Sequence, residues 1–91
     1  MTALRRTMPI VNQRGLHARA SRKLAELALA YEATIRVRRE DEEADATSLM
    51  DLMMLGAGIG SQIEVIAEGP QAETALDAIE RLVADRFGEG E

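Results

Sequence analysis

A loop gives way to a helix within the stretch Val11-Asn12-Gln13-Arg14-Gly15-Leu16-His17-Ala18-Arg19-Ala20-Ser21. Gly15 supplies a flexible turn. From Ala18 onward the apolar residues recur at helical spacing; they are Ala20, Leu24, Leu27, Ala28 and Tyr31. The spacing predicts a helix over residues 18–30. It places His17, the only histidine of the chain, at or just before the N-terminus of that helix.

The surroundings of His17 suit phosphoryl chemistry. The chain has no cysteine, and imidazole can act as a neutral nucleophile at physiological pH. Free backbone N–H groups at a helix start, with Arg19 close by, could hold the oxygens of a phosphoryl group. Arg19, Arg22 and Lys23 occupy the first two turns, where the helix dipole favours anions over cations, so we expect an anion there. A lone histidine at a helix start can also be a simple cap or a surface residue, and these residues alone leave both interpretations open.

The remainder of the chain predicts alternating strands and helices. Strands are expected over residues 6–12, 33–39, 44–46 and 62–68. The second and third strands form a hairpin through the acidic turn 40–43. Ser48 and Asp51 have capping-box spacing and predict a short helix over 48–55. A last helix opens at Gly69-Pro70, carries one apolar stripe and ends at Gly88.

This order of elements defines the fold class. Single-striped helices alternating with half-buried strands predict an α/β (α+β) open-faced sandwich, with one sheet and three helices on one face. Ninety-one residues with 46% hydrophobic content suffice for one small core, so we expect a single domain over 1–91. The residues leave the strand order open, because ferredoxin-like domains share the initial βαββαβ pattern.

The short helix over 48–55 carries too many apolar residues for one buried face. On a helical wheel Leu52 and Leu55 share one side, and Leu49, Met50 and Met53 gather on another. The second group is either core or an adaptable Met-rich surface for a partner. The following glycines, residues 56–60, lack the Lys-Ser/Thr of a phosphate-binding loop and are interpreted as a helix stop and loop.

Composition excludes several functional classes. A net charge of -5, with one Tyr and one Phe, argues against general nucleic-acid binding. Without cysteine there is no disulfide framework or thiol chemistry. Residues 1–7 lack the apolar core of a signal peptide, and no apolar run has membrane-spanning length. We therefore expect a cytoplasmic protein without membrane insertion.

Three segments carry a family resemblance. Arg14-Gly15-Leu16-His17-Ala18-Arg19 resembles the active-site signature of HPr, the histidine phosphocarriers of the phosphoenolpyruvate-dependent phosphotransferase system. The segment 48–56 resembles the family's second helix. The segment 62–71 resembles its last strand and turn, nearest to the branch associated with nitrogen regulation. The resemblance covers nearly the whole chain and implies an HPr-like antiparallel sheet of strand order 1-4-2-3.

The resemblance also implies a function. His17 would accept a phosphoryl group on Nδ1 from phospho-Enzyme I and pass it to a IIA protein, so the chain is a carrier with partner enzymes rather than an autonomous enzyme. Arg19 would neutralise the charge, and the N–H groups of Ala18, Arg19 and Ala20 would bind the oxygens. The implied partner surface comprises Leu16, Ala20, Leu49, Met50 and Met53. We expect a monomer without metal or cofactor. Sugar uptake and nitrogen-related regulation both remain open.

The alternative is a regulatory binding module. The Leu49/Met50/Met53 surface would then dock partners, with Ser48 as a switch, because some HPr proteins are phosphorylated at the corresponding serine by an HPr kinase/phosphorylase. An N-cap is the simpler role for Ser48. The chain departs from the family pattern in having Ala20 where Pro is frequent and Asp51 where a small residue is common. Asp51 would repel a phosphate on Ser48.

Overall fold

The computed structural model describes residues 2–90 and contains one four-stranded sheet and three α-helices. In chain order the elements are β1 (Leu4–Pro9), α1 (Ala18–Leu29), β2 (Thr34–Arg39), β3 (Glu42–Asp45), α2 (Leu49–Met54), β4 (Gln62–Glu68), α3 (Ala72–Ala84) and the 3₁₀ turn η1 (Arg86–Gly88).

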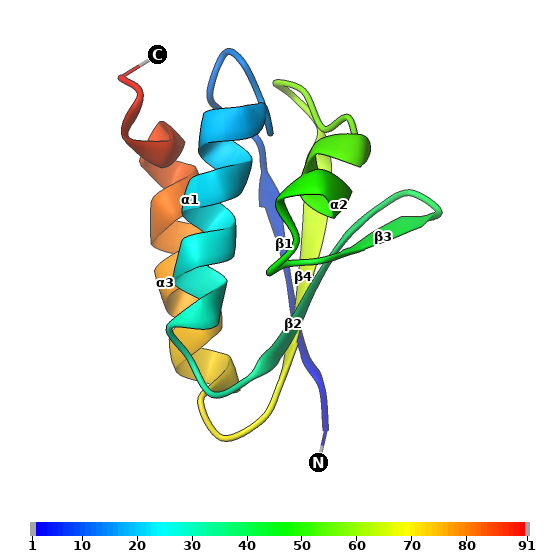
Figure 1. Cartoon of the computed structure of the whole chain (residues 1–91), viewed down its shortest axis with the longest axis vertical. Helices are drawn as coiled ribbons and strands as arrows, with labels where there is room; N and C mark the ends of the chain where they lie inside the picture. The colour runs from blue at the N-terminus through cyan, green and yellow to red at the C-terminus, as the bar shows by residue number, and fades with distance from the viewer. Residues whose placement is uncertain (1, 91) are drawn as a thin grey trace.

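The sheet has the strand order β1-β4-β2-β3, and each neighbouring pair is antiparallel. This confirms the predicted open-faced sandwich and its 1-4-2-3 order. The helices cover one face of the sheet (Figure 1). β1 lies at an edge, and Pro9 is its last paired residue, opposite Gln62. An edge strand tolerates proline because its second side needs no ladder hydrogen bond.

The core fills the space between sheet and helices. Alternation places Ile35 and Val37 of β2 inward, with Ile63 and Val65 of β4 beside them. Each helix contributes its apolar stripe to the core. Leu24 of α1, Leu52 of α2 and Ile79 of α3 are each at most 1% exposed. Removing such residues from water supplies the main driving force for folding, at about 25 cal/mol per Å² of apolar surface.

Several element boundaries differ from the sequence-based prediction. The first strand covers Leu4–Pro9 rather than 6–12, although its expected inward residues Met8 and Ile10 are buried. The acidic turn is shorter than expected, because Glu42 and Glu43 already pair with β2 as part of β3. Arg36 stabilises this pairing by an exposed ion pair with Glu43 at 3.3 Å.

The last helix differs at both ends. α3 begins at Ala72 with Gln71 as its N-cap, so Pro70 lies before the helix and not at its first position. Two hydrogen bonds with Glu32 hold Gln71 outside the helix. The Gln71 N–H donates to the Glu32 carbonyl, and the Gln71 side-chain oxygen accepts from the Glu32 N–H. At the other end α3 stops at Ala84, and Gly88 closes η1 instead. Within residues 2–90 no helix is long and apolar enough to cross a membrane.

Candidate functional site

The loop that leads into α1 is shaped by a close approach of two backbones. Gly15 has φ +64°, and a Cβ on it would overlap the carbonyl oxygen of Ala57. That same oxygen accepts a hydrogen bond from the Leu16 N–H at 2.9 Å. The 56–60 loop thus supports the loop before His17, and it follows the end of the second helix, as its interpretation as a helix stop and loop predicted.

Two fully buried polar side chains hold the same loop from inside. The Asn12 Nδ2 group donates to the Gly15 carbonyl at 2.8 Å. The Ser21 hydroxyl, one turn into α1, donates to the Leu16 carbonyl at 3.0 Å. The residues on both sides of His17 are therefore fixed to the scaffold, which limits the freedom of its backbone.

His17 is the N-cap residue of α1, but its side chain caps nothing. The first backbone hydrogen bond of the helix runs from the Ser21 N–H to the His17 carbonyl. The preceding N–H groups, those of Ala18, Arg19 and Ala20, have no acceptor within a helix. The first turn also contains no acidic residue. These donors and the positive end of the helix dipole form an anion-binding position.

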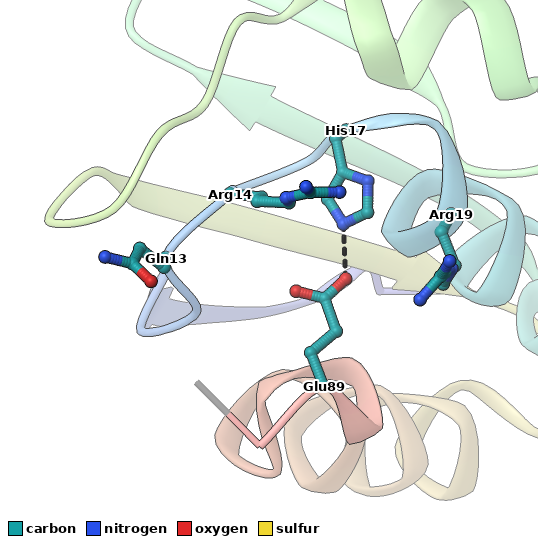
Figure 2. A pocket seen from close by; sticks show the side chains of 5 residues that line it. All are labelled: Gln13, Arg14, His17, Arg19 and Glu89. Atoms are coloured by element: carbon teal, nitrogen blue, oxygen red, sulfur yellow. Dashed lines mark hydrogen bonds and ion pairs between the residues drawn. The ribbon is translucent and has the colours of Figure 1, made fainter.

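The His17 ring lines an open hollow of about 270 Å³. Its other lining residues are Gln13, Arg14, Arg19 and Glu89 (Figure 2). Nε2 of His17 is in hydrogen-bonding contact with Oε2 of Glu89, which comes from the C-terminal segment beyond η1. Oε1 of Glu89 accepts from Asn12 Nδ2 at 3.1 Å. The hollow therefore joins residues from opposite ends of the chain.

Glu89 is ionised at neutral pH. Burial acts to raise its pKa, but the hydrogen bonds from His17 and Asn12, together with the charges of His17 and Arg19, outweigh burial and hold the pKa below its ordinary value. A carboxylate can only accept hydrogen bonds. The His17 nitrogen that contacts Glu89 must therefore be the donor.

Only one of the three bases expected at the helix start belongs to the hollow. Arg19 lines it. Arg22 pairs instead with Glu26 at 3.3 Å on the exposed side of α1. Lys23 donates to the Phe87 carbonyl at 2.6 Å and so fixes the C-terminal segment. Of the three bases, Arg19 is thus the one that adjoins the His17 ring.

The expected partner surface divides into buried and exposed residues. Leu16 and Ala20 are 5% and 0% exposed. Their side chains pack into the core and are not available to a partner, which corrects that part of the prediction. Leu49 and Met53 are partly exposed, and Met50 is 65% exposed.

The α2 helix presents these apolar residues as the helical wheel predicted. Leu52 and Leu55 are buried, and Met54 is the most exposed apolar residue of the helix at 73%. We call the exposed residues Leu49, Met50, Met53 and Met54 the α2 surface. Since α2 packs against α1 (Figure 1) and the loop after α2 supports Gly15, the α2 surface lies at the same end of the molecule as His17.

Ser48 is the N-cap of α2. Its hydroxyl accepts a hydrogen bond from the Asp51 N–H at 3.2 Å, as the capping spacing predicted. Asp51 lies in the first turn, which places a carboxylate close to the hydroxyl. Among residues 2–90 no three acidic or histidine side chains are grouped so that they could hold a metal ion.

Three contributors to the site were absent from the sequence-based prediction. Asn12 and Ser21 belong to the quoted stretch, and a polar residue at a turn is a signal for such a role. Glu89 gave no signal, because it follows the expected end of the last helix and lies 72 positions from His17.

Comparison with known proteins gives consistent matches. Residues 4–85 match the family model PTS-HPr, described as PTS HPr component phosphorylation site. The phosphocarrier protein HPr of Cupriavidus necator is 47% identical over 88 residues, covering 97% of this chain and 99% of that protein. The phosphocarrier protein NPr of Shewanella violacea is 44% identical, covering 98% of each chain. The crystal structure of HPr-C-His from Thermoanaerobacter tengcongensis superposes with a TM-score of 0.89 at 32% identity, covering 98% of each chain.

Proposed function

The chain belongs to the PTS-HPr family of phosphocarriers, and we propose that it accepts a phosphoryl group on His17 from phospho-Enzyme I and passes it to a IIA protein. The observation that carries the proposal is the position of His17: an uncapped helix N-terminus and Arg19 adjoin its ring in an open hollow. Family membership implies partners among phosphotransferase-system proteins, and the two named here are the proposed donor and acceptor.

The transfer begins with attack of a ring nitrogen on phosphorus. Nε2 of His17 donates to Glu89, so Nδ1 holds the lone pair that attacks. The Nδ1–P bond forms while the bond between phosphorus and the donor group on Enzyme I breaks, and the donor keeps the bonding electrons. Transfer to the IIA protein reverses these roles, with its acceptor nitrogen attacking the phosphoryl group on His17.

The start of α1 stabilises the transferred group. The N–H groups of Ala18, Arg19 and Ala20 bind phosphoryl oxygens, and the Arg19 guanidinium adds a charge-assisted hydrogen bond. These groups stand in place before the reaction, so they stabilise the charge that develops in transfer without reorganisation. Among the residues that line the hollow, Glu89 is the only carboxylate beside the His17 ring. This suits a carrier whose partner enzyme completes the site.

Partner docking uses the α2 surface. Met side chains adapt to differently shaped partners, and this surface adjoins the end of the molecule that carries His17. The proposal keeps Leu49, Met50 and Met53 as docking residues and drops the buried Leu16 and Ala20.

A serine switch at Ser48 has less support. The Ser48 hydroxyl already caps α2, and Asp51 would face a phosphate placed there. The negative charges of Asp51 and of a phosphate on Ser48 would repel each other, which opposes phosphorylation of Ser48. We therefore assign Ser48 the structural role of an N-cap.

Incubation with Enzyme I and phosphoenolpyruvate tests the proposed function. Mass spectrometry should show a gain of one phosphoryl group that acid removes and that a IIA protein accepts. A His17→Ala variant should gain none, whereas an Arg22→Ala variant, changed on the exposed side of the same helix, should be labelled like the parent. Labelling of His17→Ala would contradict the proposal.

A further inference from the structure

The C-terminal segment after α3 is built to deliver one carboxylate to His17. Phe87 is completely buried and anchors the segment in the core. Lys23 of α1 donates to the Phe87 carbonyl at 2.6 Å, and the Gly88 N–H donates to the Asp85 carbonyl at 2.9 Å. The residue that follows this anchored turn is Glu89.

The backbone of this turn is strained. Arg86 and Phe87 have φ values of +56° and +54°, a region that L side chains rarely adopt. Such a conformation is unfavourable for a residue with a side chain and persists only where the surroundings impose it. Here the burial of Phe87 and the Lys23 contact impose it, and the outcome is that the chain turns back over the start of α1.

Glu89 is fixed at both carboxylate oxygens. Oε2 contacts Nε2 of His17, and Oε1 accepts from the buried Asn12 Nδ2 at 3.1 Å. Asn12 in turn donates to the Gly15 carbonyl. The carboxylate thus links the ring to the same loop that fixes the His17 backbone, and its side chain is only 10% exposed.

We propose that Glu89 is a positioning residue for phosphoryl transfer, a role that rests on the proposed function of His17. Its carboxylate holds the proton of the ring on Nε2 and fixes the ring plane, so that the lone pair is on Nδ1 (Figure 2). When Nδ1 forms its bond to phosphorus, the ring keeps the Nε2 proton and becomes positively charged. The carboxylate stabilises that charge, in the way a buried carboxylate serves the histidine of a catalytic triad. The donor group on Enzyme I leaves with the electrons of its bond to phosphorus, so no proton has to leave the ring.

Two substitutions change this contact in different ways. Glu89→Ala removes the carboxylate altogether. Glu89→Gln removes the charge and leaves one oxygen, and because the buried Asn12 Nδ2 needs that oxygen as its acceptor, the amide NH₂ is turned toward Nε2 of His17. Asp85→Ala is the matched control, since it removes a carboxylate of the same segment whose side chain makes no capping hydrogen bond.

Ring NMR and transfer kinetics, measured on the same variants, test the proposal. In the parent and in Asp85→Ala the Nε2 proton of His17 should be deshielded and slow to exchange, and the ¹⁵N shifts should report Nδ1 as unprotonated in the neutral ring. Glu89→Ala should lose the Nε2 proton signal and accept phosphate from Enzyme I roughly tenfold more slowly. Glu89→Gln should also lose the signal and recover none of the rate, because its amide NH₂ donates to Nε2 and favours the tautomer with the proton on Nδ1.

Unchanged ring signals and an unchanged transfer rate in Glu89→Ala would overturn the positioning role. An unchanged rate with a lost signal would also overturn it, because the contact would then be structural only. The ring measurement needs no Enzyme I, so a parent protein that fails to accept phosphate would contradict the proposed function, while the NMR comparison would still decide whether Glu89 holds the ring.

Discussion

At the scale of single residues, the neighbours of His17 hold its backbone in place. Gly15 permits a left-handed turn against Ala57, and buried Asn12 and Ser21 fix the carbonyls on either side of the histidine. With its backbone fixed, the ring needs only to be oriented, which lowers the entropy lost when a phosphoryl group binds.

Gly15→Ala should destabilise the protein by about 2–3 kcal/mol, because alanine is strained at positive φ and its Cβ would overlap the Ala57 carbonyl. Urea unfolding followed by circular dichroism measures this loss. Gly56→Ala is the control: it has the same sign of φ, but nothing lies within 4 Å of its added Cβ. Equal destabilisation of the two variants would show that the contact with Ala57 has no energetic weight.

Arg19→Ala should slow phosphoryl transfer roughly 10–100-fold, since one charge-assisted donor to the transferred group is lost. The stability of the fold should hardly change, because Arg19 is exposed. Rates of labelling by Enzyme I under matched conditions check this, with Arg22→Ala as the comparison on the same helix. A rate equal to that of the parent would remove Arg19 from the site.

At the scale of the elements, α2 has one buried and one exposed face. Leu52 and Leu55 anchor it to the core, and the Ser48 hydroxyl caps its first turn. A helix of six residues is too short to be stable by itself. Its tertiary anchoring therefore allows the opposite face to remain apolar and exposed.

Met50→Glu should weaken binding to Enzyme I while leaving the far-ultraviolet circular dichroism spectrum unchanged, because a charge on an exposed apolar surface is penalised only on binding. Leu52→Glu should instead unfold the domain, since it places a charge at a fully buried position. Titration calorimetry with Enzyme I measures the first effect. Parent-like affinity of Met50→Glu would move the docking surface away from α2.

The elements also show what periodicity can predict. β4 occurs over the residues expected, and the helical wheel separates Leu52 and Leu55 from the methionines, although it does not say which of the two groups is buried. The end of α3 could not be foreseen, because the burial of Phe87 and its contact with Lys23 depend on tertiary packing. Strand order came from family resemblance, since the pattern of strands and helices fits more than one topology.

At the scale of the whole molecule, segments far apart in the sequence meet around the His17 ring. The loop before α1 supplies Asn12 and His17, and the segment after η1 supplies Glu89. Sequence reasoning located His17 and Arg19 through local spacing. It could not locate Glu89, because a contact across 72 positions leaves no periodic trace.

The contact of the Glu89 carboxylate with His17 should make the free energy of unfolding depend on pH in the acid range. The folded pKa of Glu89 lies below its ordinary value of 4.5, so the carboxylate contributes stability above pH 4.5 that is lost as the pH falls through the folded pKa. Glu89→Gln should be less stable than the parent by about 1 kcal/mol at pH 7. The difference should disappear at low pH. The facing charged groups are His17 and Arg19, and both stay in place in the variant.

Urea unfolding of the parent and of Glu89→Gln at a series of pH values checks this dependence, with Asp85→Gln, altered in the same segment, as the control. A stability difference that persists unchanged into strong acid would mean that the Glu89 charge is not its source.

The central claim, that His17 carries the phosphoryl group on Nδ1 because Nε2 is held by Glu89, is tested most directly by NMR of the phosphorylated protein. After phosphorylation by Enzyme I and phosphoenolpyruvate, ³¹P–¹⁵N correlation of the labelled protein identifies the nitrogen bonded to phosphorus. We expect a single phosphohistidine with phosphorus on Nδ1 of His17 and hydrogen on Nε2. Phosphorus on Nε2, or on a residue other than His17, would contradict it.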